Sequence, residues 1–429
     1  MSWLRWSGSE QLAAIASTHC MASFGTATAT AQALLPPGMA CGVLRSGVDG
    51  RARLEVGCAG QRQAVSGASP CGLTDLWHLG SNTKALTALL AAVCIERGEF
   101  GLDWGSTVGA VLGAAAGEGG GGGETIHAGY GDVTLLELLS NSGGAPGTAP
   151  EAAWTLAWER ARAGGPPIAQ RRAFVSALLA QPPAAARGSY EYSNQGFAIA
   201  GHMLETAAAA TTGQSYEQLL TSLVFKPLGV TSAGFGAVPG TDSPWGHTLE
   251  QTAWLPKDPS ELNADNPPSI TPAGCVHMTL EDYGRCLAPM LSAQIAEEQL
   301  GLSRGMWAFF STEIREPRVE TSPDSGKQGP GYALGWLAVK RPWAEGGVAM
   351  THSGSNTMNY CTVWCVPALE GGADGSTRRE GTEAGRLDGM AVLVACNAGG
   401  GPAQAAVDSA CVSILRSEIA EARKRGASF

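Results

Sequence analysis

The sequence predicts an α+β or α/β protein in which an antiparallel β-sheet is flanked by helices and interrupted by an inserted, mostly α-helical region. Three observations predict this class. Short β-like runs occur near the start of the chain, helical spacing dominates the middle, and β-like runs return near the end, before a closing helix. At 429 residues the chain is also long enough for two closely packed domains.

The two ends of the chain are expected to complete one sheet. We therefore assign 1–100 and 325–429 to a sheet domain and 101–324 to a mainly helical domain, with an active site at the interface between the two domains. Two low-complexity stretches, 117–123 and 369–386, lack hydrophobic periodicity. They are predicted to be surface loops.

The early strands and the first long helix are the clearest local elements. The runs 39–46 and 52–59 are separated by the polar turn Gly47–Gly50, which predicts a hairpin. From Ser81 to Arg97 the apolar residues repeat at helical spacing, and Gly98 is placed to end this helix.

The remaining elements follow the same division into a helical middle and a strand-rich end. The predicted helices of the middle region are Val133–Leu139, Ala152–Arg162, Arg172–Leu179, Phe197–Ala209, Tyr216–Leu223 and Thr279–Leu291. The later strands are predicted at 332–340, 347–353, 358–366 and 389–396, followed by an amphipathic helix from about residue 403 to 424.

The composition narrows the classes of partner. The net charge is −10 and the chain has no block of Lys or Arg, so we expect no nucleic-acid partner. It has no apolar leader and no uncharged apolar run of about eighteen residues, which predicts a cytoplasmic protein without an integral membrane segment. Its eleven cysteines are an odd number and include no Cys-x-x-Cys pair, which indicates reduced, buried thiols.

A serine and a lysine stand at the start of the predicted helix 81–97. Residues three apart are neighbours on a helix, so Lys84 can reach the hydroxyl of Ser81. The helix N-terminus favours developing negative charge, and burial can lower the pKa of a lysine until it acts as a base near neutral pH. Ser81 is therefore predicted to be a covalent nucleophile that Lys84 activates. The alternative is an N-cap serine beside a surface lysine.

A second candidate element is Tyr192-Ser193-Asn194, which lies directly before a helical pattern. A tyrosine beside an ammonium group can relay a proton to a leaving group, and an Asn amide can hold both a substrate carbonyl and the lysine. Tyr192 is thus predicted to be catalytic and Asn194 to bind substrate. The alternative is a pair of turn residues with a packed aromatic ring.

A third candidate element is His352-Ser353-Gly354-Ser355, at the end of an apolar run. Gly354 would let a substrate lie against the strand edge. The backbone N–H of Ser355 could then form an oxyanion hole with the N–H of Ser81.

These three elements, in this order, resemble the serine β-lactamase and penicillin-binding-protein superfamily. The resemblance is to its class C β-lactamase-related branch, which includes D,D-peptidases, family VIII esterases and LACTB-like proteins. It spans nearly the whole chain and includes further segments that look like recurring ones of this branch: Trp77–Ser81, Gly101–Asp103, Val133–Leu139, Phe225–Gly229, Pro272–Gly274 and Tyr332–Trp336.

The resemblance implies a β-lactamase/transpeptidase-like fold and an acyl-Ser81 intermediate. By this similarity Lys84 and Tyr192 would share the general-base and general-acid roles, and which of them takes the first proton stays open. Asn194 would orient the substrate, and His352 would line the β-strand side of the site. Class C β-lactamases carry Lys where this chain has His352, which is mostly neutral near pH 7. The segment Ser140–Gly147 also departs from the His-Thr-Ser-Gly-Leu of many relatives.

Three functions follow from these residues. The favoured one is hydrolysis of a small carboxylic ester or amide. The alternatives are acyl transfer or hydrolysis of β-lactams and D-amino-acid peptides, and a non-enzymatic self-assembling role. The expected partner is accordingly a small-molecule ester, amide or β-lactam-like substrate, and the sequence leaves the oligomeric state open.

The sequence also contains a rival candidate nucleophile, Ser303. Gly301–Gly305 fits the pentapeptide of an α/β-hydrolase elbow around Ser303, with Asp324 and His352 following in suitable order. The elbow requires a buried strand before it, whereas Ile295–Leu300 is charged and favours a helix. The histidines show no metal-ligand spacing, so neither a metal nor another cofactor is expected.

Overall fold

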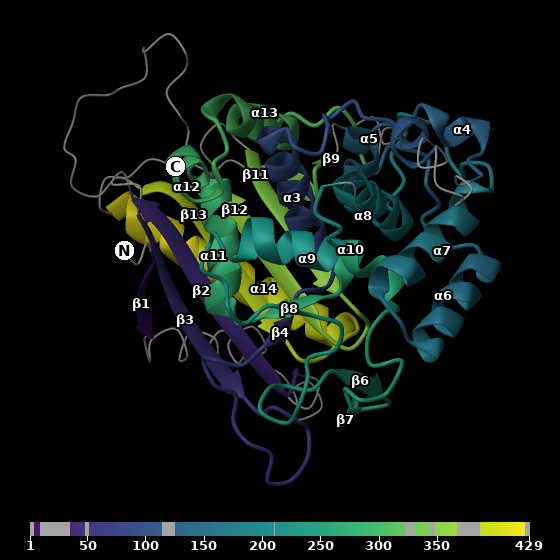
Figure 1. The fold of residues 1–429 in the computed structure, drawn as a ribbon. Coiled ribbons are helices and arrows are strands. Elements are labelled where there is room, and N and C mark those ends of the chain that lie inside the picture. The colour runs from purple at the N-terminus through teal and green to yellow at the C-terminus, as the bar shows by residue number, and fades with distance from the viewer. Residues whose placement is uncertain are drawn as a thin grey trace, which may run out of the picture.

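An eight-stranded sheet forms the centre of the protein, in the strand order β1-β3-β2-β13-β12-β11-β10-β9 (Figure 1). The computed structural model describes residues 4–8, 35–47, 51–113, 125–209, 211–321, 330–341, 343–344, 348–366 and 387–424. The strands are β1 Leu4–Gly8, β2 Gly38–Gly47, β3 Ala52–Gly60, β9 Gly331–Ala333, β10 Trp336–Lys340, β11 Val348–Ser355, β12 Tyr360–Val366 and β13 Leu387–Cys396.

Both ends of the described chain meet in this sheet, as predicted. β2 pairs antiparallel with β13 on one side and with β3 on the other, so the expected early hairpin lies beside the last strand. The later strands β10 to β13 are also antiparallel neighbours, whereas β1 adds to β3 in parallel. The mixed α and β architecture predicted from the sequence is therefore confirmed.

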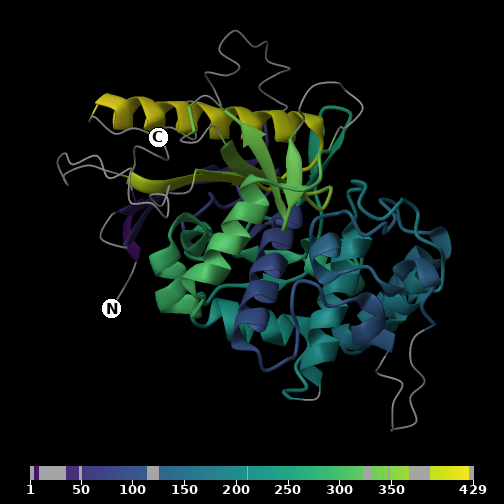
Figure 2. The ribbon, with the colours of Figure 1, turned by 90° about the horizontal axis from the view of Figure 1, so that it is seen from above.

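The apolar run of β13 is buried on both faces because consecutive side chains of a strand point to opposite sides. Ala391 and Leu393 belong to the larger hydrophobic core, whereas Val392 and Val394 belong to a second core. The second core contains α14 (Gly401–Lys424), the closing helix, which lies along one face of the sheet in Figure 2. The predicted amphipathic helix thus has the sheet as its apolar partner.

The opposite face of the sheet is covered by helices, with α3 (Thr83–Arg97) near the middle of the molecule (Figure 2). Every residue of α3 from Thr83 to Cys94 is buried, so the helix is packed on all sides. It ends at Gly98, whose φ of 69° is the left-handed conformation of a helix C-cap, as predicted. The start of α3 is held in the core, and this is where the candidate nucleophile lies.

The middle of the chain is mainly helical, as expected, and part of it, α11, packs against β2 and β13. The division of the chain at residues 100 and 324 stays a prediction. The helical elements outside α3 and α14 are η1 Gly80–Asn82, η2 Gly109–Gly113, α4 Ala128–Gly131, α5 Leu135–Leu139, α6 Glu151–Ala163, α7 Pro167–Leu179, α8 Asn194–Ala209, α9 Tyr216–Leu220, η4 Thr221–Phe225, η5 Pro268–Ile270, α10 Thr271–Gly274, α11 Leu280–Leu291, α12 Ala293–Leu300 and α13 Arg304–Arg315.

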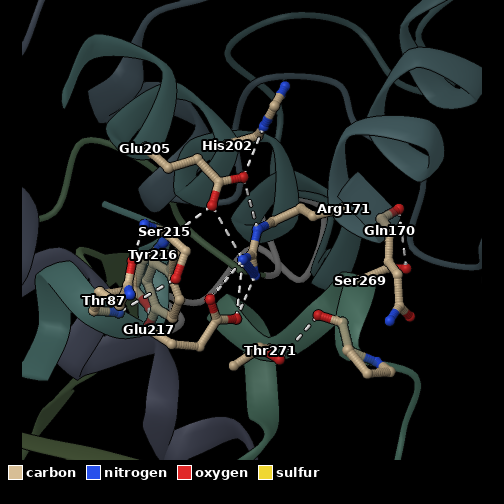
Figure 3. Close-up of polar contacts among 12 residues, drawn as sticks. Thr87, Gln170, Arg171, His202, Glu205, Ser215, Tyr216, Glu217, Ser269 and Thr271 are labelled. Atoms are coloured by element: carbon tan, nitrogen blue, oxygen red, sulfur yellow. Dashed lines mark hydrogen bonds and ion pairs between the residues drawn. The ribbon is translucent and has the colours of Figure 1, made fainter. Parts of the chain in front are cut away.

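A buried polar network joins the helices of this region to α3 (Figure 3). Arg171 of α7 pairs with Glu205 of α8 at 3.1 Å and with Glu217 of α9 at 2.9 Å. The backbone N–H of Tyr216 donates to Glu205, and the Tyr216 hydroxyl lies 2.6 Å from Oγ1 of Thr87 on α3. Because the Arg171 side chain has no exposed surface, its charge depends on these two carboxylates.

Several elements differ from the sequence prediction. The predicted strand 332–340 is two strands, because Leu334 and Gly335 both have positive φ and form a tight hairpin turn between β9 and β10. Five short strands outside the central sheet were also not predicted, since two to four residues are too few to show alternation. These strands are β4 Trp77–His78, β5 Gly234–Phe235, β6 His247–Glu250, β7 Ala253–Pro256 and β8 Val276–Met278.

The two predicted surface loops, 117–123 and 369–386, lie outside the described residues. None of the helices in the described part of the chain combines the length and the apolar character that crossing a membrane requires.

Candidate functional site

Ser81 lies in the short turn η1, directly before α3. Gly80 has a φ of 52°, and a side chain there would overlap the backbone nitrogen of Ser355. The Thr83 hydroxyl donates to the carbonyl of Gly80 at 2.7 Å, which fixes the turn to the helix. These contacts hold Ser81 between the N-terminus of α3 and the strand β11.

The Lys84 side chain is fully buried and its ammonium nitrogen contacts three oxygen atoms. Nζ lies 3.1 Å from Oγ of Ser81, 2.6 Å from Oδ1 of Asn194 and 2.8 Å from the carbonyl oxygen of Ala273. Burial lowers the pKa of Lys84 to about 7, and the neighbouring Cys275 thiol opposes this shift in part. The lysine can therefore exchange a proton near neutral pH.

The two partners other than Ser81 can only accept hydrogen bonds. A neutral amine has two N–H donors and one lone pair, so Asn194 and Ala273 take both donors of a neutral Lys84. The lone pair is then left for the hydroxyl of Ser81. This geometry suits a base that removes the proton of the serine.

Tyr192 lies beside the same lysine and serine. Its ring centroid is 4.8 Å from Nζ of Lys84, and its side chain is hydrogen-bonded to that of Ser81. Burial raises the pKa of Tyr192, and the bond to Ser81 opposes this shift in part, so the phenol keeps its proton at neutral pH. Tyr192 can therefore pass a proton on while Lys84 accepts one.

The turn that carries Tyr192 is fixed from two sides. The Ser193 hydroxyl caps α8 by accepting from the N–H of Gly196, and it donates to the carbonyl of Pro146. Oδ1 of Asn141 accepts from the N–H of Ser193 at 3.1 Å. The divergent segment 140–147 thus supports the turn of the candidate tyrosine.

His352 lies on β11 and is buried against aromatic rings. Its Nε2 is 3.2 Å from the hydroxyl of Tyr332, and its ring centroid is 6.2 Å from that of Tyr192. Burial, followed by the charge of Lys84, lowers the pKa of His352 to about 3. The imidazole is therefore neutral at neutral pH and supplies no fixed positive charge at this position of the strand.

The end of β11 runs against the nucleophile turn. A side chain at Gly354 would overlap both the Leu79 carbonyl and the backbone nitrogen of Ser81. The nitrogen of Ser355 lies beside Gly80 in the same way. The backbone nitrogens of Ser81 and Ser355 therefore lie on neighbouring segments in close contact, an arrangement that suits a two-donor oxyanion hole.

The structure thus brings the sequence-predicted residues Ser81, Lys84, Tyr192 and Asn194 into direct contact, with His352, Gly354 and Ser355 on the adjoining strand. Sequence reasoning did not identify the carbonyl of Ala273 or the hydroxyl of Tyr332 as parts of the site. Both residues lie in segments, Pro272–Gly274 and Tyr332–Trp336, whose sequences resemble recurring segments of the class C β-lactamase-related branch.

The rival nucleophile Ser303 lies between two helices and not after a strand. It is the N-cap of α13, where its hydroxyl accepts from the N–H of Met306 and donates to Glu96 at 3.0 Å. The helix α12 precedes it, as the charged stretch suggested, and Asp324 lies outside the described residues. A nucleophile elbow at Ser303 is therefore excluded.

In the described part of the chain, no group of three or more His, Cys, Asp and Glu side chains could hold a metal ion.

Comparison with known proteins gives a consistent family and fold. The family model described as Beta-lactamase matches residues 30–410. A solved octameric penicillin-binding protein homologue from Pyrococcus abyssi is 19% identical with a TM-score of 0.63, and the match covers 94% of this chain and 76% of that one.

Two further solved structures have similar folds. A D-stereospecific amidohydrolase from Streptomyces sp. is 20% identical with a TM-score of 0.59, over 89% of this chain and 97% of its own. A beta-lactamase from Sulfitobacter sp. EE-36 is 18% identical with a TM-score of 0.61, over 96% and 99%. At these identities the likeness concerns the fold alone. The comparison with curated proteins gives no match.

Proposed function

The chain belongs to the beta-lactamase family, and on this premise we propose that it is a serine hydrolase that cleaves small carboxylic esters or amides through an acyl-Ser81 intermediate. The observation that carries the proposal is the environment of Lys84. A buried lysine with a pKa of about 7 directs its one free lone pair at the hydroxyl of Ser81. A packing role gives no reason to bury a lysine in this way.

The first step is acylation. Lys84 takes the proton of Ser81 as Oγ attacks the substrate carbonyl, and the N–H groups of Ser81 and Ser355 stabilise the resulting oxyanion. A proton then passes through Tyr192 to the leaving group, which departs as an alcohol or amine. Lys84 is the first base because its pKa is lowered toward 7 while that of Tyr192 is raised.

The second step is release of the acyl group. Water, or an alcohol or amine acceptor, gives a proton to the same pair of side chains as it attacks the acyl-Ser81 carbonyl. When the second tetrahedral intermediate collapses, the bond between Oγ of Ser81 and the acyl carbon breaks and the pair gives its proton to Oγ. The product is the free acid, or the acylated acceptor. Asn194 keeps Lys84 in position throughout and offers its amide N–H₂ to the substrate.

The substrate preference follows from charge. His352 is neutral and its Nε2 faces the hydroxyl of Tyr332. The β11 side of the site therefore has polar groups but no fixed positive charge. That favours neutral acyl groups over acyl groups with a carboxylate beside the scissile bond. Amide substrates are the second candidate, because the fold is shared with a D-stereospecific amidohydrolase and a beta-lactamase.

Hydrolysis of p-nitrophenyl esters by single-residue variants tests this proposal. We expect Ser81→Ala and Lys84→Ala each to abolish ester cleavage, while Ser303→Ala, which removes a helix cap, leaves kcat unchanged. Wild-type activity retained in Ser81→Ala would contradict the proposal. Nitrocefin and D-alanyl peptides assayed beside short-chain esters then rank the ester, β-lactam and peptide alternatives.

A further inference from the structure

A buried chain of three polar side chains links the two segments that carry the oxyanion-hole donors. We propose that His78, Asp265 and Asn356 are positioning residues that fix the N–H groups of Ser81 and Ser355 relative to each other. This inference rests on the proposed function, because it gives the three side chains a task in stabilising the oxyanion. None of the three contacts the nucleophile side chain in the described hydrogen bonds.

On the nucleophile side, His78 holds the turn that precedes Ser81. The backbone N–H of Gly80 donates to Nδ1 of His78 at 3.1 Å. Because Nδ1 accepts this bond, the ring proton of a neutral His78 lies on Nε2, which is 2.9 Å from Oδ2 of Asp265. This hydrogen bond constrains the backbone of Gly80. The peptide group that joins Gly80 to Ser81 carries the N–H of Ser81, so its orientation is constrained as well.

On the strand side, Asn356 directly follows Ser355. Its Nδ2 donates to the other oxygen of Asp265 at 3.0 Å. Its Oδ1 accepts from the backbone N–H groups of Met358 and Asn359, so the amide is held at both ends. The Asp265 carboxylate therefore uses one oxygen for each segment and spans the gap between them.

The burial of this chain argues for a positioning role. The side chains of His78 and Asp265 are 0% and 5% exposed, and Asn356 is also buried. A buried carboxylate costs desolvation free energy that its partners offset only when the geometry is well formed. Here both partners belong to segments that must stay in register for two N–H groups to meet one oxygen atom.

Replacing Asp265 by Ala should therefore disturb catalysis as well as folding. It leaves Nε2–H of His78 and Nδ2 of Asn356 without their acceptor. We expect kcat for a p-nitrophenyl ester to fall by about tenfold to about a hundredfold, with KM nearly unchanged, because donor alignment matters most in the transition state.

His78 provides a graded pair of variants. His78→Ala removes the acceptor of the Gly80 N–H, and we expect a loss similar to that in Asp265→Ala. An asparagine can accept from the N–H two residues on, as in an Asx-turn, so His78→Asn should recover part of kcat. A packing role for the imidazole predicts no such recovery, since asparagine fills the space poorly.

The decisive measurement is the affinity of each variant for phenylboronic acid, which forms a tetrahedral adduct with a serine nucleophile. We expect this affinity to fall in proportion to kcat in His78→Ala and Asp265→Ala. The matched control is His202→Ala, which removes a buried histidine 2.8 Å from Glu205, away from the nucleophile. It should lower Tm and leave kcat and boronate affinity unchanged.

The outcomes separate this inference from the proposed function. An inactive wild type without a Ser81 adduct contradicts the proposed function itself. An active wild type whose His78→Ala and Asp265→Ala variants lose only Tm, as the control does, contradicts the positioning role alone. If either alanine variant does not fold, Asp265→Asn and His78→Asn decide. Unchanged boronate affinity in both contradicts the inference, and a fall in either supports it.

Discussion

At the scale of single residues, the central feature is the set of partners around one lysine. Two of the three oxygen atoms around Lys84, Oδ1 of Asn194 and the carbonyl of Ala273, can only accept hydrogen bonds, whereas the hydroxyl of Ser81 can also donate. The protonation state of the amine therefore decides whether the serine hydroxyl is a donor or an acceptor. Because burial brings the pKa of Lys84 to about 7, both states occur near physiological pH.

The pH dependence of ester cleavage follows from this lysine. Only the neutral amine can take the proton of Ser81, so kcat/KM should rise with pH through about 7 and level off above it. Below the pKa the rate should fall by about tenfold per pH unit. A profile that stays flat from about pH 5 to about pH 9 would show that another group is the base.

The same shift couples Lys84 to stability. The pKa of Lys84 is about 7 in the folded protein, against 10.5 for a lysine exposed to water, as in the unfolded chain. Between these two pH values the unfolded chain therefore binds more protons than the folded protein. Stability therefore rises with pH across this window, and below pH 7 the cost of burying the charge is fully present. Denaturant unfolding measures the free energy of unfolding of the wild type and of Lys84→Met. As pH increases, the value for the wild type should rise relative to that for the variant. A pH-independent difference would contradict the lowered pKa.

Some site residues can be read from the sequence and others cannot. Ser81 and Lys84 are predictable because residues three apart at the start of a predicted helix come into contact, and the turn η1 before α3 keeps this contact. Tyr192 and His352 come from the ordered resemblance of the motifs. Ala273 contributes a backbone carbonyl, which every residue type has, so only the packing of α10 against α3 reveals its role.

At the scale of elements, the site depends on the close approach of β11 to the nucleophile turn. Gly354 and Gly80 face each other's backbones, and side chains at either position would overlap main-chain atoms. Backbone atoms at a strand edge cannot move aside as a flexible side chain can. The spacing of the two proposed oxyanion donors, the N–H groups of Ser81 and Ser355, thus depends on two glycines.

Gly354→Ala should consequently separate β11 from the turn. We expect ester cleavage to fall by about a hundredfold or more, because the Ser355 donor is displaced. Gly131→Ala is the matched control, since its φ is not positive and a side chain there would meet no atom within 4 Å. Equal rates of ester cleavage in the two variants would contradict a role for the close contact between β11 and the turn that carries Ser81.

The helices around α3 are held by the buried pairs of Arg171. Breaking a buried ion pair by removing one partner costs about 3–5 kcal/mol, so Arg171→Met should lower the free energy of unfolding by about this amount. The exposed pair of Arg97 and Glu99 gives the comparison, and Arg97→Met should cost less than about 1 kcal/mol. Chemical denaturation measures both variants, and similar losses would contradict the burial argument.

Elements with a clear hydrophobic periodicity were predictable from the sequence, and strands of two to four residues were not. The helix α3 and the hairpin of β2 and β3 carry enough residues for their periodicity to show. The turn of two residues within the predicted strand 332–340 was not predicted. Leu334 adopts a positive φ there, which apolar residues rarely do, so the residue type gave no sign of a turn. A two-residue strand such as β4 is recognisable only by its pairing with another strand, here β8, and this pairing is not visible in the sequence.

At the scale of the whole molecule, the fold places parts of distant sequence around one serine. Ser81 comes from the turn before α3, Tyr192 from the turn before α8 and His352 from β11, which belongs to the central sheet. The sequence predicted the α and β class and the closure of the sheet through the pattern of elements. The substrate is not predictable in the same way, since it depends on the shape and charge of the walls that surround Ser81.

Covalent labelling of Ser81 tests the central claim most directly. The intact protein is incubated with a fluorophosphonate, digested and mapped by mass spectrometry, with Ser81→Ala treated in parallel. We expect one adduct, on the peptide that contains Ser81, at a rate that rises with pH through about 7 as Lys84 loses its proton, and no adduct in the variant. Labelling of another residue, or equal labelling of Ser81→Ala, would contradict the account.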